Sequence, residues 1–246
     1  MATQRDLQVI WFDQDDTLYD YGAAMRRSLA AALTAMRQTL PGGVPGLDVD
    51  ALIAVREEIA DRCDRAGMGL VQTRQESFRE ALARFAAPDE RLADAMSEAY
   101  YAVLFTGTRP LPETEPCLRA LQPHWTLGVL SNGLPLIEGL GIAHYFRHLL
   151  YAGDAEPGKP QIKFFRLAEQ TAGARPEQCL LVGDNESVDV VGARDAGWHA
   201  VWLNRGGRAW SVGGPPPGHV IASLSELPEL LGVLTGDRHR SSATRQ

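Results

Sequence analysis

The chain has 246 residues, of which 45% are hydrophobic, and its formal net charge at pH 7 is −7. A chain of this length buries a large core, as one domain or as a core with a smaller insertion. The negative charge argues against a basic surface for nucleic acid or anionic membranes. We therefore expect a small-molecule ligand, with no nucleic-acid and no membrane partner.

The N-terminal stretch MATQRDLQVI has neither the basic nor the apolar region of a signal peptide. No run of about 18 apolar residues, the length that a membrane-spanning helix needs, occurs in the sequence. The three cysteines, Cys63, Cys117 and Cys179, are too widely spaced for a disulfide framework or a paired metal motif. We expect a cytoplasmic protein, and the sequence carries no signature of its oligomeric state.

The first predicted element is a buried strand at residues 7–12, where LQVIWF is continuously apolar. Helical patterns follow over about 22–105, where apolar residues recur every three or four positions. They are Met25, Leu29, Leu33, Met36 and Leu40, then Leu52, Val55, Ile59 and Cys63, then Phe78, Leu82 and Phe85. Proline and glycine at 40–46, and Pro88, separate these patterns. The sequence thus predicts an all-helical insert after the first strand.

Three more apolar runs predict strands at 126–131, 179–183 and 199–204. Helical segments are expected between them, at 162–173 and at 188–197, the second ending at a glycine as a helix C-cap does. Alternation of strand and helix is typical of an α/β fold with a doubly wound, Rossmann-like parallel sheet. We expect a core at 1–18 and 109–235, a helical cap at 19–108 and a disordered polar tail at 236–246.

Polar residues follow the predicted strands where each strand ends. Because the carboxyl ends of parallel strands meet at one edge of a sheet, where ligands bind, we expect these side chains to lie together. The first strand is followed by Asp13 and Asp15, the second by Ser131, Asn132 and Gly133, the third by Asp184, Asn185 and Asp189, and Lys159 precedes a helix.

Clustered carboxylates repel one another unless a cation joins them, and a small set of oxygen ligands suits Mg²⁺. We expect Mg²⁺ on Asp13 and Asp184, where it can hold a phosphate oxygen. Lys159, Ser131 and backbone N–H groups can neutralise the remaining oxygens. The residues therefore predict phosphoryl transfer with an aspartate as the nucleophile.

Four segments in order, DQDDTL at 13–18, LSNG at 130–133, GKP at 158–160 and GDNESVD at 183–189 followed by GARDAG, resemble the motifs of the haloacid dehalogenase superfamily. The resemblance covers about residues 8 to 234. It implies a Rossmann-like core with a helical cap inserted after the first strand. It also implies a phosphatase-type member that hydrolyses a small phosphate ester.

The resemblance implies a role for each motif residue. Asp13 is the nucleophile and a metal ligand, and Asp15 is the general acid and base with its main-chain carbonyl on Mg²⁺. Thr17 supports that loop and is grouped with the phosphate-binding residues Ser131, Asn132 and Gly133. Lys159 stabilises the nucleophile and the phosphate, Asp184 binds the metal, and Asp189 and Asn185 support it.

Some alternatives stay open. Gln161 and Ile162 stand where family members often carry a second proline, so Lys163 is a rival for Lys159. A 2-haloacid dehalogenase is a second candidate function, although such members lack an acid equivalent to Asp15 and use no Mg²⁺. A non-catalytic regulatory or binding protein of the same fold is a third. The motif sequences resemble those of members that act on nucleoside monophosphates or sugar phosphates.

Overall fold

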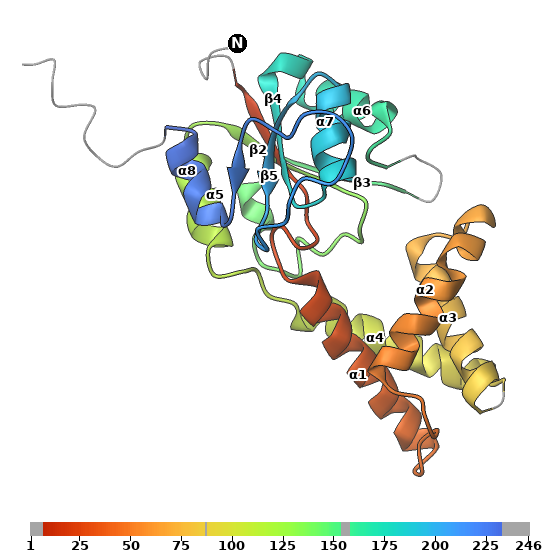
Figure 1. Cartoon of the computed structure of the whole chain (residues 1–246). Helices are drawn as coiled ribbons and strands as arrows, with labels where there is room; N and C mark the ends of the chain where they lie inside the picture. Colours follow the sequence, from red (N-terminus) through yellow and green to blue (C-terminus); the bar gives the residue numbers. More distant parts are fainter. Residues whose placement is uncertain (1–6, 87, 154–157, 233–246) are drawn as a thin grey trace, which may run out of the picture.

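The computed structural model describes residues 7–86, 88–153 and 158–232 (Figure 1). Its centre is a six-stranded, all-parallel sheet with the strand order β3-β2-β1-β4-β5-β6. The strands are β1 (Val9–Phe12), β2 (Thr126–Ser131), β3 (His148–Tyr151), β4 (Cys179–Gly183), β5 (His199–Leu203) and β6 (Val220–Ile221). The predicted tail at 236–246 lies outside the described residues.

Helices cover both faces of the sheet. Alternate side chains of β1 point to opposite faces, so neighbouring residues of this strand pack against different helices. Trp11 belongs to an apolar cluster with α6 (Ile162–Ala172) and α7 (Gly192–Asp195). Phe12 belongs to a second cluster with α5 (Thr114–Leu121) and α8 (Leu227–Leu230). This confirms the predicted α/β, Rossmann-like doubly wound fold.

The four predicted strands are present, and the structure adds two at the edges of the sheet. All four residues of β3 are only half-buried, and β6 has two residues, so neither forms the continuous apolar run that marks a central strand. The helix predicted at 188–197 is a π-helical turn at Glu186–Val191 followed by the short α7. Gly197 has a φ of 81°, as expected for a helix C-cap. Short 3₁₀ turns occupy Ala143–Tyr145, Pro176–Gln178 and Leu224–Glu226.

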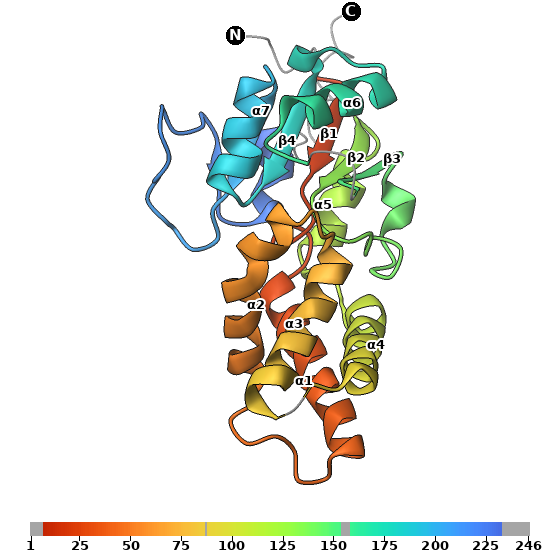
Figure 2. The same cartoon turned by 90° about the vertical axis from the view of Figure 1, so that its right-hand side faces the viewer.

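Four helices follow β1: α1 (Tyr21–Thr39), α2 (Val49–Arg65), α3 (Leu70–Phe85) and α4 (Glu90–Gly107). They fall within the insert that the apolar periodicity predicts. Asp20, Asp48 and Asp89 cap the N-termini of α1, α2 and α4 by accepting a backbone N–H. α1 packs along α4 and α2 packs on α3, so the group extends from the sheet end where β1 stops (Figures 1 and 2).

Within the described ranges, no helix combines the length and the apolar character that crossing a membrane requires.

Candidate active site

The carboxyl ends of three neighbouring strands bring the predicted acidic and basic residues together. β1 lies between β2 and β4, so Asp13 at the end of β1 is flanked by the loops that follow those strands. The Nζ atom of Lys159 donates to Oδ1 of Asp13 and to Oδ1 of Asp189, each at 2.7 Å. The Lys159 side chain is fully buried and that of Asp189 is 3% exposed. The centre of the site is therefore a buried ammonium between two carboxylates.

Lys163, the rival for Lys159, is exposed on α6, with no ion pair among the described residues. The geometry selects Lys159 as the lysine at Asp13.

A third carboxylate, Asp184, completes an acidic triad. One oxygen each from Asp13, Asp184 and Asp189 lies within 4.8 Å of the other two. Burial raises the pKa of Asp184 to about 6, and the charges of Asp189 and Asp16 add to this. Burial also raises the pKa of Asp13, against the lowering effect of Lys159. Three carboxylates facing one ammonium form a hard oxygen donor set with excess negative charge, which fits Mg²⁺.

Close packing around the triad depends on a glycine. A Cβ on Gly183 would lie 2.3 Å from Oδ2 of Asp189, an oxygen that accepts the backbone N–H of Asn185 at 3.0 Å. Asn185 is exposed, and its own Oδ1 accepts the N–H groups of Ser187 and Val188, capping the turn that carries Asp189. Asn185 thus supports the triad through the backbone.

Asp15 lies in the loop after β1, where Oδ1 accepts the Tyr19 hydroxyl at 2.5 Å and Nε2 of Gln14 at 3.0 Å. Gln14 also donates to the carbonyl of Leu134 at 2.8 Å, which ties this loop to the one after β2. Burial raises the pKa of Asp15, and the two hydrogen bonds oppose that rise. The sequence analysis assigns no role to Gln14 or Tyr19, and it did not predict these contacts.

The loop after β2 positions Lys159. Oδ1 of Asn132 accepts the backbone N–H of Lys159 and its Nδ2 donates to the Lys159 carbonyl, both at 2.8 Å. Both polar atoms of the Asn132 side chain thus bind the backbone of Lys159. The amide is therefore not free to make the predicted contact with phosphate. Oγ of Ser131 accepts the Gly133 N–H at 2.9 Å, and a Cβ on Gly133 would lie 2.6 Å from Asp15.

Thr17 does not reach a surface that a ligand can contact. It is fully buried, its hydroxyl has no hydrogen-bond partner among the described residues, and its carbonyl accepts Nη2 of Arg205 at 3.2 Å. The structure thus places Thr17 inside the loop and not among phosphate-binding groups.

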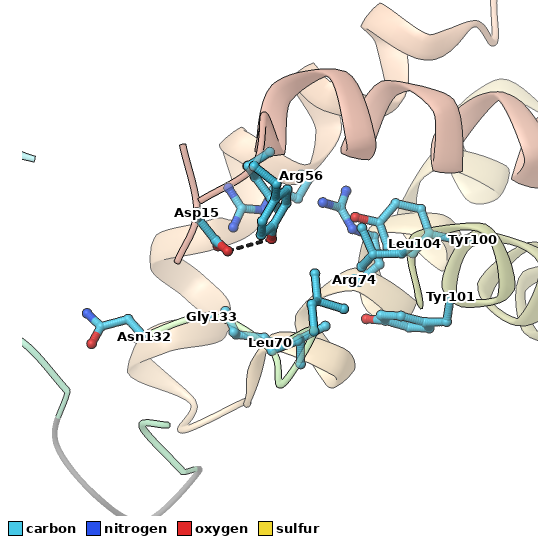
Figure 3. A pocket seen from close by; sticks show the side chains of 13 residues that line it. Asp15, Arg56, Leu70, Arg74, Tyr100, Tyr101, Leu104, Asn132 and Gly133 are labelled. Atoms are coloured by element: carbon cyan, nitrogen blue, oxygen red, sulfur yellow. Dashed lines mark hydrogen bonds between the residues drawn. The ribbon is translucent and has the colours of Figure 1, made fainter. Parts of the chain in front are cut away.

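A cavity of about 260 Å³ opens next to Asp15, between the sheet and the helical insert (Figure 3). The sheet side contributes Asp15, Asn132 and Gly133, and the insert contributes Arg56, Leu70, Arg74, Tyr100, Tyr101 and Leu104. The acid of the β1 loop and the helices thus share one small chamber.

The fold and the site define an α/β protein that carries an aspartate–lysine–aspartate centre at the carboxyl edge of its sheet. Residues 7–197 match the family model described as haloacid dehalogenase-like hydrolase, so the chain belongs to this family. This confirms the resemblance seen in the motifs.

Relatives carry both phosphatase and dehalogenase names. The phosphoserine phosphatase of Thermus thermophilus is 39% identical over 140 residues, which cover 54% of this chain and only 55% of that protein. The glyceraldehyde 3-phosphate phosphatase of Methanothermobacter thermautotrophicus is 29% identical over 205 residues, 80% of this chain and 86% of that one. A solved 2-haloacid dehalogenase from Pseudomonas syringae has a TM-score of 0.72 at 31% identity, covering 92% of this chain and 98% of its own. The family and its named phosphatases support the prediction of a phosphatase enzyme.

Proposed function

We propose that the protein is a Mg²⁺-dependent phosphomonoesterase that acts on a small phosphorylated metabolite. The observation that carries this proposal is that Asp13 lies at the sheet edge with the Lys159 ammonium bonded to it and the carboxylates of Asp184 and Asp189 close by. Nucleoside monophosphates and sugar phosphates are the substrate classes with which a screen should begin.

Asp13 is the proposed nucleophile. Its carboxylate oxygen attacks phosphorus in line and forms an aspartyl phosphate as the bond from phosphorus to the leaving oxygen breaks. Lys159, which already donates to Asp13 at 2.7 Å, holds the nucleophile and balances charge on the phosphoryl oxygens. The hydroxyl of Ser131 and the backbone N–H groups after β2 are the proposed partners of the other phosphoryl oxygens.

Asp15 is the proposed general acid and base. Its raised pKa favours the protonated form that gives a proton to the leaving alcohol. Asp15 then takes a proton from the water that attacks the aspartyl phosphate, which releases inorganic phosphate and restores Asp13. Both steps need the carboxyl group to point into the chamber, and the hydrogen bonds from Tyr19 and Gln14 fix it there.

Asp13, Asp184 and the main-chain carbonyl of Asp15 are the proposed metal ligands, with Asp189 in support. When bound, Mg²⁺ supplies positive charge next to the transferring phosphoryl group. Helices α1–α4 are the proposed cap, which excludes water from the chamber and selects the substrate.

Asp15 also separates this proposal from a dehalogenase. Nucleophilic displacement of a halide from a 2-haloacid requires no proton donor for the leaving group, whereas loss of an alkoxide does. A carboxyl group held at the chamber by two hydrogen bonds therefore favours phosphate-ester hydrolysis. Halide release from 2-chloropropionate without Mg²⁺ would support the dehalogenase instead.

The test is turnover of an aryl phosphate such as para-nitrophenyl phosphate with Mg²⁺ present. Asp13→Asn should abolish turnover while leaving the circular dichroism spectrum unchanged, and EDTA should abolish it reversibly. Activity that persists in the variant or in EDTA would contradict the proposed mechanism. Binding of a macromolecule without any phosphate release across an ester panel would favour the non-catalytic alternative.

A further inference from the structure

The chamber next to Asp15 contains a buried positive charge that has no counter-ion among the residues the structure describes. Arg74 is 5% exposed, and its Nη1 atom has no hydrogen-bond partner within the described part of the chain. Its guanidinium lies over the Tyr100 ring, 4.7 Å from the centroid, and this stacking contact gives the N–H groups of Nη1 no acceptor. Because arginine stays charged and a buried unpaired charge is costly, this position needs an anionic partner.

Arg56 adds a second positive charge to the same chamber. It is half-buried on α2, and Figure 3 shows the side chains of Arg56 and Arg74 directed into the cavity from α2 and α3. No ion pair to a described carboxylate is found for either residue. By contrast, two arginines on the outer surfaces of the same helices are paired, Arg62 with Glu80 at 3.1 Å and Arg79 with Glu90 at 2.7 Å. Arg56 and Arg74 thus bring two positive charges without a described counter-ion to one chamber, and Arg74 is buried there.

The position of Asp15 shows which part of a substrate reaches these arginines. If Asp15 protonates the leaving oxygen, the leaving group must occupy the chamber that Asp15 lines, and Arg56 and Arg74 line the same chamber. The phosphoryl group itself stays at Asp13 and Lys159. The positive charges therefore face the leaving alcohol and not the phosphate.

We infer that the substrate is a phosphate monoester whose leaving alcohol carries a carboxylate, and that Arg74, assisted by Arg56, binds this carboxylate. This inference rests on the proposed phosphatase function and narrows its substrate class. The planar guanidinium fork matches the two oxygens of a carboxylate. The volume of about 260 Å³ limits the leaving group to a small hydroxy acid or sugar acid.

The test compares substrates that differ only in the carboxylate. Two matched pairs cover two leaving-group lengths: 3-phosphoglycerate with glycerol 3-phosphate, and 6-phosphogluconate with glucitol 6-phosphate. In at least one pair, wild-type kcat/KM should be about 10- to 100-fold higher for the acid, the range that a charge-assisted hydrogen bond supplies. A ratio near one in both pairs would overturn the inference without any variant being needed.

Arg74→Gln should lower kcat/KM for the acid far more than for the neutral ester, so that their ratio falls close to one. Arg74→Lys, which keeps the charge but loses the fork, should give an intermediate ratio. Arg62→Gln is the matched control on the outer surface and should keep the wild-type ratio. A wild-type ratio that survives in Arg74→Gln would overturn the assignment of Arg74. If the wild-type enzyme hydrolysed none of these esters, that result would instead contradict the proposed function.

Discussion

Replacement of Lys159 by methionine tests the buried charge cluster of the active site. The Lys159 side chain is fully buried, and its Nζ atom lies 2.7 Å from one oxygen each of Asp13 and Asp189. Methionine fills similar volume but leaves two carboxylates without their counter-charge. Because breaking a buried ion pair leaves an uncompensated charge, we expect the free energy of unfolding to fall by about 3–5 kcal/mol.

The loss should depend on pH in a defined direction. Burial already raises the pKa of Asp13 and the ammonium opposes this rise, so removing Lys159 raises that pKa further. Asp13 of the variant should therefore keep its proton to a higher pH than Asp13 of the wild type, and below that pH the repulsion with Asp189 is relieved. The destabilisation, measured by urea unfolding in EDTA, should be larger at pH 8 than at pH 5.

Lys163→Met is the matched control, because Lys163 is exposed and unpaired among the described residues. It should unfold at the wild-type urea concentration and keep wild-type kcat. Lys159→Met should lose about 10²- to 10³-fold in kcat, the size found when one group that stabilises developing charge is removed. Equal stability and activity in the two variants would refute the assignment of Lys159, as would loss of activity in the control alone.

Three further predictions concern the acidic triad. Gly183→Ala would place Cβ 2.3 Å from Oδ2 of Asp189, so urea unfolding should show a loss of about 1–3 kcal/mol, whereas Gly42→Ala, with open space around it, should not. In EDTA, stability should fall as pH rises from about 4 to 6, because folded Asp184 keeps its proton up to a pKa of about 6 and the unfolded chain loses it near 3.8. This fall should be smaller in Asp184→Asn. Since bound Mg²⁺ needs the carboxylates deprotonated, MgCl₂ should raise the melting temperature more at pH 8 than at pH 5.

The central sheet could be predicted because a strand covered on both faces must be apolar throughout. Val9 to Phe12 are all buried, as are the five residues of β4. At the edges this rule no longer applies, since all four residues of β3 are only half-buried and β6 is too short to show a pattern. The helices of the insert could be predicted from the spacing of their apolar residues, because each helix buries one face against a neighbour.

The acidic centre could be predicted from motif order, but its supporting contacts could not. Asn132 pairs with the backbone of Lys159 across 27 positions, and Gln14 bonds to Leu134 across 120. Such contacts are set by how loops meet in space and leave no local pattern. Arg74 is a further example, because the sequence alone does not distinguish it from the paired, exposed Arg62 on the neighbouring helix.

The loop after β1 connects Asp15, the proposed general acid, to the helical insert. Tyr19 donates to Asp15, and the next residue, Asp20, caps α1 by accepting the N–H of Ala23 at 2.7 Å. α1 packs along α4, which contributes Tyr100 to the chamber and to the contact with Arg74. One of the two segments that join these helices to the rest of the fold is therefore the segment that orients Asp15. If the leaving group binds Arg74, that binding energy also acts on the alignment of Asp15, the proposed proton donor, so a substrate without the anionic group should lose kcat as well as affinity.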